Sequence, residues 1–210
     1  FEPTATVKQT HTEKRRLPIL VDVSQSMSVK DQRKRSEDIG EAAVALGILP
    51  LSSTPEDVKR NAVSLNGKQR EAIASASRLD LATSLLSNSA EEMLGSITED
   101  LDVSYHAFGE TLQRLGDADS GIKKSLAALQ SDSPETSIGK ALEALAKTER
   151  DAPLAGVVLV SDGLDTFSRR PESVVRDRGP RGLRVYTVPV GLAEPAEVSS
   201  RPVRIRERLL

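Results

Sequence analysis

Three oxygen-bearing side chains follow a short apolar run near the start of the chain. Asp22, Ser24 and Ser26 come directly after residues 19–21 (Ile-Leu-Val), whose composition is typical of a strand buried on both faces of a parallel sheet. Their spacing of two places a carboxylate and two hydroxyls at the carboxyl end of that strand, which is where open α/β folds bind their ligands. Hard oxygens of this kind suit a small divalent cation, with Mg²⁺ or Mn²⁺ ahead of the softer metals. The same residues also fit a strand end whose Ser and Asp cap the next segment.

Two further segments supply matching oxygens. Thr136 lies at the mouth of a loop that leads into a predicted helix at 138–146. A second apolar strand, at 156–160, is followed by Ser161, Asp162 and Gly163. Gly163 has no Cβ, so it either lets the next loop pass close to a metal or serves as a plain turn residue.

These three segments, taken in order, resemble the metal-ion-dependent adhesion site of the von Willebrand factor A (vWA) domain. The resemblance implies a metal site made of five residues: Asp22, Ser24, Ser26, Thr136 and Asp162. It implies that the two serines bind Mg²⁺ (or Mn²⁺) directly, that the threonine binds directly or through water, and that the aspartates hold coordinated waters. Hydroxyl ligands are neutral, so the ion would keep much of its charge and accept an Asp or Glu carboxylate from a partner protein.

The order of predicted elements indicates an α/β fold with a doubly wound, mostly parallel sheet flanked by helices and one antiparallel edge strand. We expect the first strand to begin at Leu17 and the last to cover 182–191. Residues 102–109 alternate like a strand half-exposed at a sheet edge, with 111–115 as a hairpin partner. Helices are predicted at 37–46 with Ser36 as N-cap, from Thr54 onward, and at 68–76, 77–86 (continuing to 94), 121–129, 138–146 and 170–175.

The predicted long helix at 77–86 begins farther along the chain than the first long helix of a vWA domain usually does. We therefore interpret about 28–77 as a helical insertion beside the metal site, within a vWA-like domain at 17–192. Residues 1–16 are expected to be a leading linker, and 193–210 a basic tail or the start of another domain. Bacterial membrane-anchored members of the family carry such insertions, and the chain is most similar to those.

Composition narrows the possible functions. The net charge is −2 with both signs interspersed, which is not the footprint of a nucleic-acid-binding protein. The absence of cysteine excludes thiol chemistry and Cys-type zinc sites, and it favours a bacterial over an animal extracellular protein. Aromatic residues make up only 2%, so Leu, Val, Ile and Ala must build the core.

No apolar run reaches the ~18–20 residues of a membrane-spanning helix, so membrane contact is expected only through segments outside this chain. The chain begins at Phe1 without an initiator Met, and we expect it to be a piece of a longer protein. By analogy with the family, that protein is membrane-associated with this domain on the periplasmic side, although the sequence does not decide between periplasm and cytoplasm.

Two other functions fit parts of the pattern. A Mg²⁺-dependent hydrolase could use Asp22 as nucleophile, but the known phosphatase pattern needs a second carboxylate two residues later, where this chain has Ser24. A serine hydrolase needs a poised histidine, and only His11 in the linker and His106 in the predicted edge strand exist. We therefore expect a protein that is not an enzyme. The alternative is a scaffold that makes its contacts through 28–77 and keeps a purely structural metal site.

Overall fold

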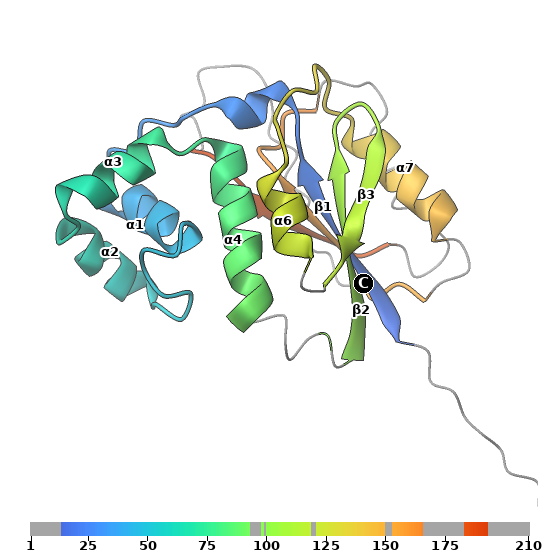
Figure 1. Cartoon of the computed structure of the whole chain (residues 1–210), viewed down its shortest axis with the longest axis horizontal. Coiled ribbons are helices and arrows are strands. Elements are labelled where there is room, and N and C mark those ends of the chain that lie inside the picture. Colours follow the sequence, from blue (N-terminus) through green and yellow to red (C-terminus); the bar gives the residue numbers. More distant parts are fainter. Residues whose placement is uncertain are drawn as a thin grey trace, which may run out of the picture.

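The computed structural model describes residues 14–92, 98, 100–118, 121–149, 153–165 and 183–192. These ranges contain a five-stranded sheet with the strand order β3-β2-β1-β4-β5 (Figure 1). β1 pairs in parallel with β2 and β4, and β5 pairs in parallel with β4, whereas β3 is antiparallel to β2. The predicted mostly parallel sheet with one antiparallel edge strand is therefore confirmed. The strands are β1 (Arg15–Asp22), β2 (Leu101–Phe108), β3 (Leu112–Asp117), β4 (Val157–Ser161) and β5 (Val185–Pro189).

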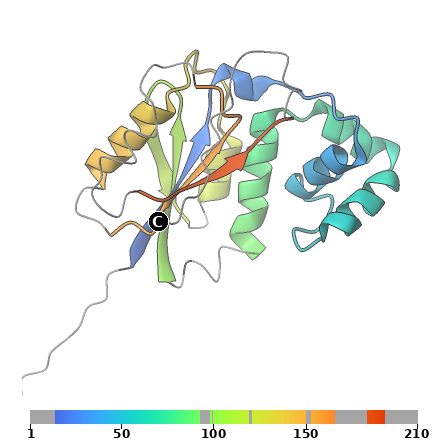
Figure 2. The ribbon, with the colours of Figure 1, turned by 180° about the vertical axis from the view of Figure 1, so that it is seen from behind.

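Helices cover both faces of this sheet (Figures 1 and 2). Ile19 and Val21 of the central strand pack in one apolar cluster with residues of α4 and α6, whereas Leu20 packs in another with residues of α7. All three side chains are buried, which explains why residues 19–21 are apolar in succession rather than at alternate positions. The helices are η1 (Gln25–Ser28, a 3-10 turn), α1 (Ser36–Ala45), α2 (Pro55–Val63), α3 (Gly67–Ser75), α4 (Arg78–Glu92), α6 (Ile122–Ala127) and α7 (Ile138–Thr148).

Three of these helices, α1 to α3, lie together beside α4 (Figure 1). We call residues 29–77 the three-helix segment. Helices α1 and α3 share an apolar cluster that includes Ala43 and Ile73 and also reaches Leu81 of α4. Thr54 caps α2 by accepting a hydrogen bond from the Asp57 N–H at 3.2 Å, and Pro55 occupies the first turn as predicted. The predicted cap of α1 is off by one residue, because Ser36 is the first residue of the helix rather than its cap.

The prediction of an exposed edge strand at 102–109 is wrong. β2 lies between β1 and β3, and residues 103–108 are all buried. His106 is 4% exposed, and its Nε2 lies 3.2 Å from the hydroxyl of Ser104, which is also buried. Ser104 and His106, the polar residues of the alternating pattern, are thus a buried hydrogen-bonding pair, and the strand at the edge of the sheet is β3.

Several predicted boundaries move or lie outside the described residues. β1 begins at Arg15, two residues before the expected start, and β5 covers a shorter range than 182–191. The leading linker up to residue 13, the helix predicted at 170–175 and the tail at 193–210 lie outside the described residues.

Candidate metal centre

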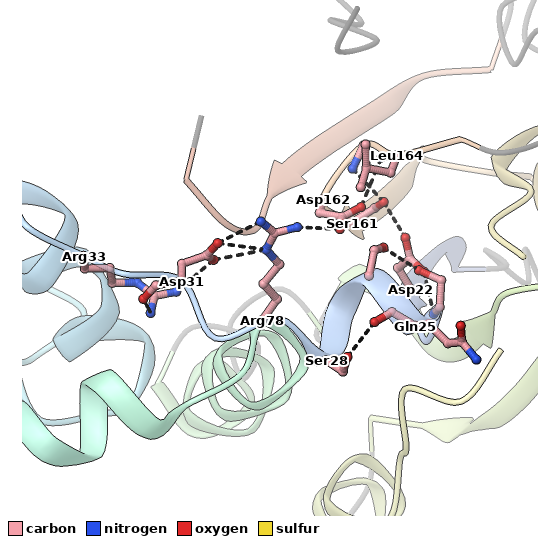
Figure 3. Close-up of polar contacts among 12 residues, drawn as sticks. Asp22, Gln25, Ser28, Asp31, Arg33, Arg78, Ser161, Asp162 and Leu164 are labelled. Atoms are coloured by element: carbon pink, nitrogen blue, oxygen red, sulfur yellow. Dashed lines mark hydrogen bonds and ion pairs between the residues drawn. The ribbon is translucent and has the colours of Figure 1, made fainter. Parts of the chain in front are cut away.

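Four of the five candidate ligands, all but Thr136, lie at or just after the carboxyl ends of two neighbouring strands, and Figure 3 shows Asp22 and Asp162 there. Asp22 is the last residue of β1 and Ser161 is the last of β4. The pairing of Val21 with Val160 brings these two strand ends level with each other, and the Ser161 hydroxyl donates to Asp22 Oδ2 at 2.6 Å. The parallel register therefore places the first and third predicted segments at one edge of the sheet.

Asp22 is fully buried and held by hydrogen bonds to both carboxylate oxygens. Its Oδ1 accepts the backbone N–H of Ser24 at 2.9 Å, while Oδ2 accepts the Ser161 hydroxyl. Burial raises the pKa of Asp22, the bonds from Ser161 and Ser24 lower it in part, and the charge of nearby Asp162 raises it further. A nearby cation would stabilise the charged form of this buried carboxylate.

The two serine hydroxyls lie at the separation that a small octahedral ion requires. Ser24 is the N-cap of η1, and that single turn brings its Oγ to 2.9 Å from the Oγ of Ser26. Adjacent oxygens of a Mg²⁺ octahedron with bonds of ~2.0–2.1 Å also lie about 2.9 Å apart. The hydroxyl pair therefore fits the ion without rearrangement.

Thr136 belongs to a loop that hydrogen bonds tie to the same edge. Ser133, earlier in this loop, forms an isolated parallel bridge with Ser24, and its carbonyl accepts the N–H of Gln25 at 2.8 Å. On the other side of Thr136, the N–H of Ser137 donates to the Gly109 carbonyl, just after β2, at 3.2 Å. Thr136 itself is 2% exposed, at the entrance to α7. The structure thus brings all three predicted segments to one edge.

Asp162 is held from two directions. Its Oδ1 accepts the Leu164 N–H at 3.1 Å, and its Oδ2 accepts Nη1 of Arg78 at 2.8 Å. Between them Gly163 adopts φ +79°, in the left-handed region that favours glycine, and a Cβ there would meet no atom within 4 Å. Of the two roles considered for Gly163, the turn is the one that the backbone requires.

Sequence reasoning missed three contributors to this site. Ser161 could have been found, because it precedes Asp162 at the end of a buried strand opposite Asp22. Arg78 and Asp31 gave no signal, since their contacts join positions 47 and 84 residues apart in the sequence.

The donor set points to a hard cation. The described residues contain no group of three or more His, Cys, Asp or Glu side chains placed to hold a metal. What the strand ends bring together is two carboxylates and three hydroxyls, from Asp22, Asp162, Ser24, Ser26 and Thr136. Such an all-oxygen set suits Mg²⁺ or Mn²⁺ and disfavours metals that prefer nitrogen or sulfur ligands.

No protein-family model and no curated protein matches the sequence. Two solved structures from Bacteroides match most of the chain. An aerotolerance-related membrane protein from Bacteroides fragilis NCTC 9343, with multiple mutations to serines, is 19% identical with a TM-score of 0.54, over 91% of this chain and 77% of that one. The conserved hypothetical protein BatB from Bacteroides thetaiotaomicron is 17% identical with a TM-score of 0.53, over 92% and 76%. At these identities the likeness shows the fold alone, and with the strand order it supports one conclusion: the chain has the fold of a von Willebrand factor A domain.

Proposed function

We propose that this protein is a non-enzymatic docking domain that binds a partner protein through a divalent metal. Asp22, Ser24, Ser26, Thr136 and Asp162 would hold Mg²⁺ or Mn²⁺ at the carboxyl edge of the sheet. The observation that carries the proposal is the 2.9 Å separation of the Ser24 and Ser26 hydroxyls beside a buried carboxylate. A bound ion would supply a positively charged acceptor for an Asp or Glu side chain of the partner.

The residues favour docking over catalysis for a physical reason. If the aspartates hold the ion through water, as the resemblance implies, the groups that touch it directly are neutral hydroxyls, and the ion keeps much of its charge at its open position. The histidine considered as a base, His106, is buried within β2 and makes its hydrogen-bond contact with Ser104. A partly neutralised cation at a strand edge is suited to attract an anionic group from outside.

We also propose that the domain belongs to a larger membrane-associated bacterial protein and lies on its periplasmic side, with the three-helix segment as an insertion into a domain at 17–192. Support comes from the likeness in fold to the Bacteroides fragilis membrane protein. Within the ranges that the structure describes, no helix is long and apolar enough to cross a bilayer. In this proposal, attachment to the membrane uses other segments of the parent protein.

The metal is tested first by thermal unfolding in EDTA and in excess Mg²⁺ or Mn²⁺. A ligand at about a hundred times its Kd adds roughly 2.7 kcal/mol, which for a chain of this size raises Tm by roughly 5–10 °C. The rise should disappear in Ser24→Ala and persist in Ser75→Ala, whose hydroxyl bonds the Ala72 carbonyl on the exposed face of α3. An equal rise in both variants would show that the ion binds elsewhere.

Docking is tested separately with acetate as a minimal carboxylate and acetamide as its neutral analogue. Water-proton relaxation by protein-bound Mn²⁺ reports water molecules on the ion, and at constant ionic strength acetate should reduce it whereas acetamide should not. If Mn²⁺ binds but acetate does not change the water-proton relaxation, the docking proposal is overturned while the metal site is retained.

A further inference from the structure

A row of alternating charges joins the three-helix segment to the candidate metal loop (Figure 3). Arg33 Nη2 lies 3.3 Å from Asp31 Oδ2, Arg78 Nη2 lies 2.7 Å from Asp31 Oδ1, and Arg78 Nη1 lies 2.8 Å from Asp162 Oδ2. The four side chains retain only 5%, 7%, 12% and 2% of their exposure along the row from Arg33 to Asp162. Charges so poorly hydrated depend on their neighbours for compensation, so a change at one is felt by the next.

Arg78 is the fixed centre of this row. Its backbone N–H donates to the Val29 carbonyl at 3.0 Å, which ties the start of α4 to the loop after η1. After β5, the chain passes directly over the guanidinium at Gly191, where a Cβ would lie 2.6 Å from Arg78 Nε. The guanidinium thus bonds Asp31 after β1 and Asp162 after β4, and it lies against Gly191 after β5.

This placement puts a permanent positive charge beside Asp162, one of the two carboxylates that would help to hold the metal. Arginine stays protonated at any ordinary pH. A divalent ion beside Asp162 would be repelled by Arg78 and attracted by Asp31, with little water between to screen either charge. The affinity for the ion thus contains a contribution from residues that are not ligands.

We propose that Arg78 is a positioning residue that orients Asp162 and lowers the metal affinity of the site, and that Asp31 partly offsets this effect. Arg78, at the start of α4, then weakens metal binding, and the three-helix segment relieves this effect in part through Asp31. The inference rests on the metal site of the proposed function. It also implies that a partner bound to the segment changes the affinity for the ion whenever it alters these contacts, and that the ion changes the partner's affinity by the same factor.

The proposal predicts opposite effects for two variants of one ion pair. Arg78→Gln removes the repelling charge and leaves two acidic groups for the ion to neutralise, so Mn²⁺ affinity should rise on the order of tenfold. Asp31→Asn leaves Arg78 without its main counter-charge, so Mn²⁺ affinity should fall by a similar factor. A purely structural role would lower the affinity in both variants or leave both unchanged.

The experiment measures Mn²⁺ affinity from the EPR signal of the free ion, with each variant's fold checked by circular dichroism. Arg78→Lys keeps the charge and should stay within about threefold of wild type. Arg60→Gln is the matched control, because it breaks another Arg–Asp pair of the three-helix segment, with Asp57, at an arginine that is 75% exposed. It should leave the affinity unchanged.

Two results would overturn the proposal in distinguishable ways. Shifts of the same sign in Arg78→Gln and Asp31→Asn would overturn this inference alone, whereas a wild-type protein that binds no Mn²⁺ would overturn the proposed function as well. Should either variant fail to fold, the Arg78 Nε–H NMR signal of wild type, assigned by its loss in Arg78→Lys, provides the readout. Saturating Mg²⁺ should shift that signal, and an unchanged signal would contradict the proposal.

Discussion

The hydroxyl of Ser161 donates to Asp22 Oδ2 across 2.6 Å and so joins the last residues of two adjacent parallel strands. The same hydroxyl accepts the N–H of Gly163 at 3.0 Å, which fixes the loop that carries Asp162. A single side chain therefore links Asp22 to the loop that carries Asp162. This bond explains why the ends of the two paired strands form one connected site rather than two independent loops.

Replacing this hydroxyl should weaken both the fold and the site. Ser161→Ala leaves a buried carboxylate oxygen without its partner, which should cost about 1–3 kcal/mol of unfolding free energy. Because Ser161 orients a proposed ligand, Mn²⁺ affinity should also fall on the order of tenfold. Urea denaturation in EDTA and Mn²⁺ titration measure the two effects. Ser64→Ala, which removes an exposed hydroxyl bonded to the Asn61 carbonyl, should change neither.

Tyr105 should be replaceable by phenylalanine with a gain in stability. Among the described residues its hydroxyl is a buried polar atom without a hydrogen-bond partner, and burial raises its pKa to about 12. Tyr105→Phe removes that unsatisfied group while keeping the ring, so the free energy of unfolding should rise on the order of 1 kcal/mol. Tyr186→Phe, at an exposed position on β5, should have no effect on urea denaturation. A destabilised Tyr105→Phe would show that the hydroxyl has a bonded partner such as a buried water.

His106 should make the protein less stable in mild acid. Burial lowers the pKa of His106 below its ordinary value of 6.5, and the charge of Arg114 lowers it further. The unfolded chain therefore binds this proton more readily than the folded one, so stability is fully present above pH 6.5 and is lost as the pH falls through the folded pKa. Urea midpoints for wild type should drop between pH 7.5 and 5.5 by more than those for His106→Gln. Parallel curves for the two proteins would assign the acid sensitivity to other groups.

The sequence predicted the mostly parallel sheet and its buried strands because apolar runs are local signals. The apolar residues 19–21 before Asp22 are visible without any structure, as are residues 157–160 before Ser161 and Asp162. The error at 102–109 arose because polar residues of the strand were taken as exposed, whereas the contacts of Arg78 gave no signal in the sequence at all. His106 is buried because it pairs with Ser104, and Arg78 is nearly buried because it lies between two carboxylates. Pairing of this kind depends on tertiary contacts that no periodicity encodes.

Gly163 gives a last test of how the metal loop is built. Its φ of +79° lies in the left-handed region, yet a Cβ would meet no atom within 4 Å, so strain alone should decide the cost of a side chain. Gly163→Ala should lower the unfolding free energy by about 1–2 kcal/mol, and Gly163→Asn should lower it by less because Asn tolerates this conformation. Gly67→Ala is the control, because Gly67 also lies in open space but has no positive φ. At this position, the start of α3, alanine should be neutral or should stabilise the fold by up to about 1 kcal/mol. If Gly163→Ala and Gly67→Ala change the urea-denaturation stability equally, the loop at 163 must relax away from the left-handed turn. Asp162 would then lose the hydrogen bond from the Leu164 N–H that holds it at the strand edge.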